Sequence, residues 1–198
     1  MSDAISILQH LLKDEFISNY EVNNKSSIIP ITLAETNSKL PYNIKIINVP
    51  SDCILIKMDK FQGQSSLFKG NHDECKCADY CLVAASKTNG NHIVYIELKH
   101  GNSKNKVISQ LKGAKCLLEY CKAVVGEYFD DKEFLNDYYE HYVCISNIQR
   151  SMKKTPTRIT SISNDTPETF LKIEGMCQVH FNRCIQKLSS PEIGRAHV

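Results

Sequence analysis

The order of patterns along this 198-residue chain predicts an α/β fold with a mixed β-sheet flanked by helices. Two amphipathic helical patterns, at 4–20 and 104–122, are separated by runs with the length and composition of strands. Two of these runs, 78–85 and 92–99, are joined by a short polar segment rich in turn-forming residues, which predicts a β-hairpin.

The first helix is predicted over 4–20, because its apolar residues recur at spacings of three and four and Ser2 or Asp3 can cap it. The segment 22–42 mixes a short apolar run that contains Pro30 with polar residues, and we expect it to be irregular.

Strands are predicted at 44–49 and 53–58, with a turn at 50–52 between them. The polar segment 62–74 holds two glycines and is expected to be a loop. The hairpin follows, and its second strand, 92–99, has the clearest strand pattern of the chain.

The helix predicted at 104–122 presents one apolar stripe, formed by Val107, Leu111, Ala114, Leu118 and Cys121. A strand is predicted at 142–146. Short elements at 170–173 and 177–185, whose type the pattern leaves open, end the chain.

The composition is that of an ordinary globular protein, with 42% apolar and 23% charged residues, and it predicts a single domain over 1–191. The net charge of +2 does not by itself indicate nucleic-acid binding, although a local basic patch is compatible with it. No segment approaches the roughly 20 apolar residues of a membrane span. Nine cysteines without an export signal favour reduced thiols and a cytoplasmic location.

The last residues, 192–198, resemble the translation of a sequencing adapter. We interpret them as an artefact and leave them out of the fold prediction. The alternative is a natural polar tail.

The candidate chemistry concentrates in the predicted hairpin. Side chains alternate across a strand, so Glu97 and Lys99 share one face of 92–99 while their apolar neighbours point to the other. Asp79 stands at the start of the facing strand among apolar residues, where an unpaired charge is costly to bury. If the strands pair, Asp79 and Glu97 converge.

Two converging carboxylates repel each other, and a divalent cation relieves that repulsion. Hard oxygen ligands suit Mg²⁺ or Mn²⁺, which can polarise a phosphate and lower the pKa of a bound water. Lys99 would add a positive charge where a transition state gains negative charge. Gln110 lies on the apolar stripe of the following helix, from which it could reach the site.

These residues resemble the PD-(D/E)xK, or restriction-endonuclease-like, nuclease superfamily. The resemblance covers about 53–146 and rests on Asp79 before an apolar strand, Ile96-Glu97-Leu98-Lys99, and a helix with Gln110-Leu111, in that order. In the variant that the chain resembles most, cysteine directly precedes the aspartate and glycine directly follows the lysine. Here Ala78 follows Cys77 and His100 follows Lys99, which leaves the role of Cys77 open.

The resemblance implies a restriction-endonuclease-like core and a Mg²⁺- or Mn²⁺-dependent nuclease. It implies that Asp79, Glu97 and the backbone carbonyl of Leu98 bind the metal, that Lys99 is the catalytic lysine, and that Gln110 is an accessory residue. Many members add a glutamate from an N-terminal helix, and the candidates here are Glu15, Glu21 and Glu35.

The implied substrate is nucleic acid, in prokaryotic defence or repair. We favour DNA, but the pattern does not decide between DNA and RNA. A homodimer or partner proteins of a larger system are compatible with this interpretation. The alternative is a nuclease-fold binding module or partner subunit without activity. The pattern does not decide between endonuclease and exonuclease, nor does it give sequence specificity.

Each feature also has a simpler interpretation. Glu97 and Lys99 could be an ion pair on a solvated strand face, and Gln110 could be a packed amide bonded to backbone. A zinc site at Cys75, Cys77 and Cys81 is disfavoured, because the first spacing is too tight for a knuckle and no second knuckle follows. The basic run 150–158 could contact phosphates or form a solvated loop.

Overall fold

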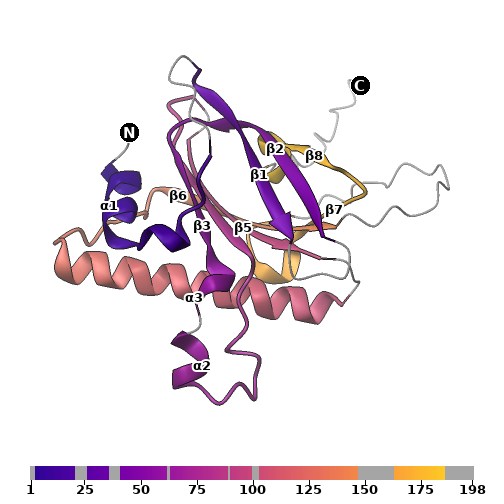
Figure 1. The fold of residues 1–198 in the computed structure, drawn as a ribbon. Coiled ribbons are helices and arrows are strands. Elements are labelled where there is room, and N and C mark those ends of the chain that lie inside the picture. Colours follow the sequence, from indigo (N-terminus) through magenta and orange to yellow (C-terminus); the bar gives the residue numbers. More distant parts are fainter. Residues whose placement is uncertain are drawn as a thin grey trace, which may run out of the picture.

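The computed structural model describes residues 3–20, 26–35, 41–61, 63–88, 90–99, 103–146 and 163–185. The predicted mixed α/β fold is confirmed, but the strands form two mixed sheets instead of one. Figure 1 shows helix α3 (Lys104–Tyr128) crossing one face of the five-stranded sheet, with the three-stranded sheet on the opposite side. One apolar core lies between the two sheets, and a second lies between the larger sheet and the helices.

The five-stranded sheet has the order β3-β4-β5-β6-β7. Its strands are β3 (Cys53–Lys57), β4 (Tyr80–Ala84), β5 (Asn91–Leu98), β6 (Tyr138–Ser146) and β7 (Leu171–Glu174). The first three pair antiparallel, which confirms the predicted hairpin of β4 and β5, and the last three pair parallel. Strand β4 is buried along its whole length, as its unbroken apolar sequence predicts for a strand covered on both faces.

The three-stranded sheet consists of β1 (Ile28–Glu35), β2 (Tyr42–Pro50) and β8 (Gln178–His180). The prediction of irregular structure at 22–42 is therefore wrong for β1. Pro30 lies at a bulge between the pairs Ile29↔Val49 and Ile31↔Ile46, where β2 has one residue more than β1. Proline, which has no N–H to donate, is tolerated at such a break in the ladder.

The N-terminal helix is shorter than predicted. Helix α1 (Asp3–Leu11) is followed by the 3₁₀ turn η1 (Asp14–Phe16), so the chain is not helical up to residue 20. Ile17 instead forms an antiparallel bridge with Ile56, and the Ser18 N–H donates to the Leu55 carbonyl at 2.8 Å. This pairing satisfies backbone groups at the edge strand β3, which a longer helix would leave exposed.

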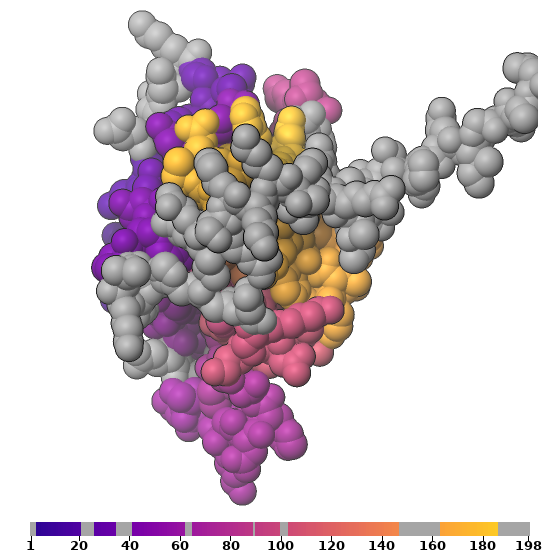
Figure 2. Space-filling model, turned by 90° about the vertical axis from the view of Figure 1, so that its right-hand side faces the viewer, coloured from indigo at the N-terminus to yellow at the C-terminus, as the bar shows by residue number. Residues whose placement is uncertain are grey.

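Helix α3 buries the predicted stripe and continues beyond the predicted end at Lys122 to Tyr128. The short helix α2 (Gly63–Leu67) lies within the predicted loop 62–74, and Figure 2 shows this segment standing out from the body of the molecule. The remaining elements are the 3₁₀ turns η2 (Met58–Lys60) and η3 (Pro167–Thr169), and the C-terminal helix α4 (Phe181–Cys184).

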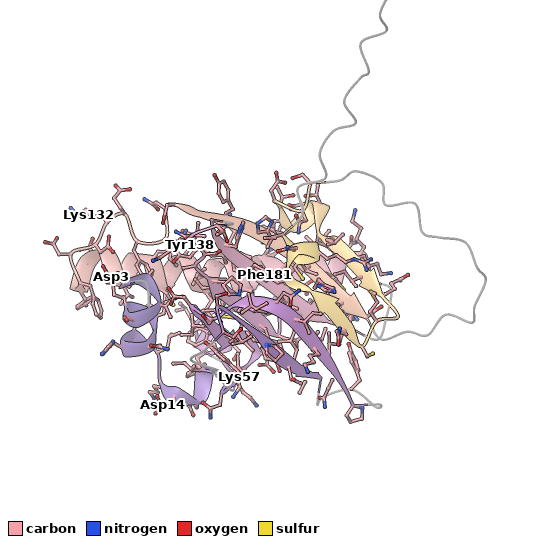
Figure 3. All side chains as sticks on the ribbon, turned by 90° about the horizontal axis from the view of Figure 1, so that it is seen from above. Asp3, Asp14, Lys57, Lys132, Tyr138 and Phe181 are labelled. Atoms are coloured by element: carbon pink, nitrogen blue, oxygen red, sulfur yellow. The ribbon has the colours of Figure 1, made fainter. Side chains whose placement is uncertain are left out.

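Phe181, labelled in Figure 3, is fully buried in the core between the two sheets. None of the nine cysteines forms a disulfide. In the part of the chain that the structure describes, no helix has the length and apolar character needed to cross a bilayer.

Candidate active site

Glu97 is an acidic residue near the carboxyl end of β5, on the sheet face that α3 covers. Its neighbours Ile96 and Leu98 pack in the core between the sheets, and Tyr95 packs in the core beneath α3. The predicted alternation of β5 is therefore confirmed. Glu97 itself is only 2% exposed, so the carboxyl group has almost no contact with water.

Asp79 lies directly before β4 and opposite Glu97, since the next pair in the register is Tyr80↔Ile96. Its Oδ2 accepts the Leu98 N–H at 2.6 Å, and its own carbonyl accepts the Met58 N–H at 2.9 Å. The hairpin and the end of β3 together fix this carboxylate beside Glu97.

Lys99 and Gln110 complete the group. The Lys99 Nζ lies 3.4 Å from Glu97 Oε1 and also donates to Gln110 Oε1 of α3. The structure thus brings together the predicted residues Asp79, Glu97, Lys99 and Gln110. The Leu98 side chain points to the opposite core, and only its backbone is at the site.

The electrostatics of Glu97 are unfavourable for a metal-free carboxylate. Burial, and then the nearby charge of Asp79, raise the pKa of Glu97 to about 9, although Lys99 acts in the opposite direction. Glu97 Oε2 is buried and has no hydrogen-bond partner among the described residues. This unpartnered oxygen and the neighbouring carboxylate are hard donors of the kind that Mg²⁺ and Mn²⁺ prefer, so the residues fit such an ion.

The described residues offer no larger set of metal-ligating side chains. They contain no group of three or more His, Cys, Asp and Glu side chains arranged to hold a metal. An ion at this site would therefore rest on Asp79 and Glu97, with the backbone carbonyl of Leu98 as the further ligand that the superfamily resemblance implies.

Two cysteines lie near the carboxyl groups: Cys77, whose role the sequence left open, and Cys144, which the sequence did not place at the site. Cys144 of β6 pairs with Glu97 in the sheet register. Burial, followed by the charge of Glu97, raises the pKa of Cys144 to about 12. Burial also raises the pKa of Cys77 to about 12, with smaller contributions from nearby acids that include Asp79 and Glu97. Both thiols therefore stay protonated at neutral pH in the metal-free protein.

The segment that leads into Asp79 is held against α3 at a glycine. A Cβ at Gly113 would lie 1.7 Å from the Lys76 carbonyl oxygen, so only glycine allows this crossing. One turn away, the Ser109 hydroxyl donates to Asp73 Oδ2 at 3.1 Å, and Asp73 Oδ1 lies 2.5 Å from Lys76 Nζ. These contacts position the approach to Asp79 relative to the helix that carries Gln110.

One predicted feature is separate from this group, and the others lie outside the described residues. Glu15 is exposed in η1. Glu21, the side chain of Glu35, the basic run 150–158 and the tail 192–198 lie outside the described residues.

Comparisons of the chain with protein-family models, with curated proteins and with solved structures gave no match. We therefore infer the function from the residues of the site. The central feature of the site is the buried carboxyl group of Glu97, which has one unpartnered oxygen. It lies beside the half-buried Asp79 and beside a lysine that an amide on α3 holds in place.

Proposed function

We propose that this chain is a Mg²⁺- or Mn²⁺-dependent nuclease with a restriction-endonuclease-like core, which hydrolyses phosphodiester bonds in nucleic acid, with DNA as the preferred substrate. The observation that carries the proposal is Glu97, which is 2% exposed, lies beside Asp79 and has one oxygen without a partner. Such an acid is costly for the apo fold, and a bound cation would offset that cost.

Asp79, Glu97 and the Leu98 carbonyl would hold the ion. When bound, a divalent cation at these ligands supplies Lewis acidity toward a phosphate and toward an attacking water. The carboxyl groups of the chain serve as the anionic ligands, and the backbone N–H of Leu98 keeps Asp79 in a fixed orientation through the 2.6 Å hydrogen bond.

Lys99 provides the fixed positive charge. Its side chain is only 18% exposed, so its charge is weakly screened by water and can stabilise the negative charge that develops on the phosphate oxygens. Gln110 accepts a hydrogen bond from Lys99 and thereby keeps the ammonium group beside Glu97. In this proposal Gln110 is a positioning residue that acts through Lys99.

The positive charge at the N-terminal end of α3 is consistent with a polyanionic substrate. Lys104 and Lys106 are both exposed there, in the helical turns before Gln110. The partial positive charge of a helix N-terminus and these two lysines favour binding of a phosphate backbone.

The proposal is tested first with the unmodified protein. Labelled single-stranded DNA, double-stranded DNA and RNA are incubated with Mg²⁺, with Mn²⁺ or with a chelator. We expect metal-dependent cleavage, faster on DNA than on RNA. Absence of cleavage on all three substrates would instead support the inactive binding module.

Two substitutions then separate metal binding from turnover. Glu97→Ala removes a ligand, so both Mn²⁺ binding and cleavage should be lost. Lys99→Ala removes no ligand, so Mn²⁺ binding, followed by electron paramagnetic resonance, should persist while cleavage falls roughly a hundredfold.

Lys115→Ala is the matched control, because Lys115 forms a comparable ion pair, 2.9 Å from Glu140, between α3 and β6 but outside the site. Its cleavage rate should remain that of the wild type. If Lys99→Ala cleaves as fast as the control, the assigned role of Lys99 is wrong even if the protein is a nuclease.

A further inference from the structure

Ser146, the last residue of β6, is a second buried polar group without a partner. It is 0% exposed, and its Oγ has no hydrogen bond to any described residue. A hydroxyl can donate one hydrogen bond and accept two, so an unpartnered one in a core is costly unless another state of the protein uses it.

The register of the sheet places Ser146 beside Lys99. Leu98 pairs with Ile145 in the parallel ladder, and the Lys99 N–H continues that ladder by donating to the Ile145 carbonyl at 3.0 Å. Cys144, two residues before Ser146, packs in the core beneath α3. Ser146 therefore faces the same side of the sheet as Glu97 and Lys99.

The neighbour of Ser146 in the adjacent strand β7, Glu174, forms an ion pair with another residue. Glu174 pairs with Ser146 in the β6–β7 register, and its Oε1 lies 2.6 Å from Lys172 Nζ. Lys99, in contrast, has an ammonium group with three N–H donors. The described structure gives it two acceptors, Gln110 Oε1 and, at the long distance of 3.4 Å, Glu97 Oε1.

We propose that Ser146 is a positioning residue for Lys99: when Asp79 and Glu97 hold the metal, the Ser146 hydroxyl accepts an N–H of Lys99 and, together with Gln110, keeps the ammonium group at the site. This inference rests on the proposed function. A carboxylate that binds a cation attracts the lysine ammonium group less strongly. A third hydrogen-bond acceptor would therefore stabilise the ammonium group when the metal is bound. Ser146 is placed for that role by the sheet register.

The first test measures metal binding and stability, not activity. Ser146→Ala removes a hydroxyl that is unpartnered in the apo protein, so the apo unfolding midpoint should stay the same or rise. In the loaded protein it removes a hydrogen bond from a charged group, so the dissociation constant for Mn²⁺ should rise roughly three- to tenfold. A clear drop in apo stability without a change in Mn²⁺ affinity would show that Ser146 is merely structural.

Threonine and valine at position 146 provide a matched pair, because they have nearly the same shape and differ by the hydroxyl. Ser146→Thr should bind Mn²⁺ more tightly and cleave faster than Ser146→Val, whatever packing cost the extra methyl groups impose on both. Equal behaviour of these two variants would overturn the inference.

A double-mutant cycle tests whether Ser146 acts through Lys99. In a Lys99→Met background, Ser146→Ala should leave the Mn²⁺ dissociation constant unchanged. A full effect in that background would mean that Ser146 acts on the metal site without Lys99, which contradicts the proposal.

Measurements on the wild-type protein distinguish failure of the proposed nuclease function from failure of the Ser146 inference. If it binds Mn²⁺ and cleaves nucleic acid but Ser146→Ala behaves as wild type, only the Ser146 inference fails. If it binds Mn²⁺ and cleaves nothing, the proposed nuclease function is wrong. The double-mutant cycle of Ser146 and Lys99, measured by Mn²⁺ binding, then still decides the role of Ser146. If it binds neither Mn²⁺ nor Mg²⁺, both are overturned.

Discussion

At the scale of single residues, two acids on the sheet face beneath α3, the half-buried Glu140 and the buried Glu97, have opposite surroundings. Glu140 accepts hydrogen bonds from Lys115 at 2.9 Å, Tyr142 at 2.7 Å and Tyr95 at 3.1 Å. Burial alone would raise the pKa of Glu140, but the bonds from Lys115 and Tyr142 outweigh it and lower the pKa. Glu97 has Lys99 at the long distance of 3.4 Å, a side-chain hydrogen bond with Asp79 that raises its pKa, and one unpartnered oxygen. The fold therefore can satisfy a carboxylate in this layer, and it leaves Glu97 unsatisfied.

The raised pKa of Glu97 predicts how stability depends on pH. The folded state holds a proton on Glu97 up to about pH 9, whereas the unfolded chain releases it near its ordinary value of 4.5. The wild type should thus lose stability as the pH rises between these values. Glu97→Gln removes that loss, so at pH 7 without metal it should be more stable by roughly 1–3 kcal/mol. Near pH 4 the gain should vanish, as denaturant titrations can show.

Glu140→Gln is the control of opposite sign. The pKa of Glu140 is lowered, so its contribution is present above the unfolded value and is lost as the pH falls. This variant should be less stable than the wild type at pH 7 and approach it in acid. If both glutamine variants shift stability in the same direction at pH 7, the contrast drawn between the two acids is wrong.

At the scale of elements, α3 connects the two halves of the site. It carries Gln110, and at Gly113 it lets the Lys76–Cys77 backbone pass close enough to direct the chain into Asp79. The exposed face of such a helix would tolerate alanine, and alanine favours helix by about 1 kcal/mol over glycine. At Gly113 the steric overlap with backbone outweighs that preference.

Gly113→Ala should therefore destabilise the protein by roughly 1–3 kcal/mol, because neither the helix nor the Lys76 carbonyl can move freely. It should also weaken Mn²⁺ binding, since Asp79 follows this crossing by three residues. Gly126→Ala in the same helix meets no described atom closer than 3.9 Å and should be neutral or stabilising by up to about 1 kcal/mol. Thermal unfolding of the two variants side by side measures the difference, and equal midpoints would contradict the crossing argument.

At the scale of the whole molecule, the five-stranded sheet is shared by both cores. One face packs against the three-stranded sheet, and the other face packs against α1 and α3. The position of the site residues on the helix-covered face therefore depends on the packing of the core between the two sheets. The last described elements, β8 and α4, close the core between the sheets with Phe181. The Phe181 ring also packs edge-on against the His92 ring, with 6.1 Å between the ring centroids.

Phe181→Ala should cost roughly 3–5 kcal/mol, because it leaves a cavity in the core between the sheets. Because the two cores share one sheet, unfolding should remain a single transition, the same by circular dichroism and by tyrosine fluorescence. Phe68→Ala is the control, since Phe68 is half exposed and its loss should change stability by less than about 0.5 kcal/mol. Two separate transitions in Phe181→Ala would show that the cores fold independently.

The sequence alone determined the parts of this protein that depend on local periodicity. Alternation along 92–99 put Glu97 and Lys99 on one face, and the turn-rich segment before it predicted the hairpin that sets Asp79 opposite Glu97. The stripe of α3 followed from its spacing in the same way. These features need only near neighbours in the chain, so the pattern of residues is enough to predict them.

Only the tertiary structure decided the features that depend on distant pairing. The pattern predicted one sheet where there are two, missed β1 because Pro30 lies at a bulge, and extended the first helix through residues that instead pair with β3. The contact of Lys99 with Gln110, and the place of Ser146 beside Lys99, follow from the parallel register of β5 with β6 and from how α3 packs on them. Register and packing are set by the whole core at once, and no local pattern encodes them.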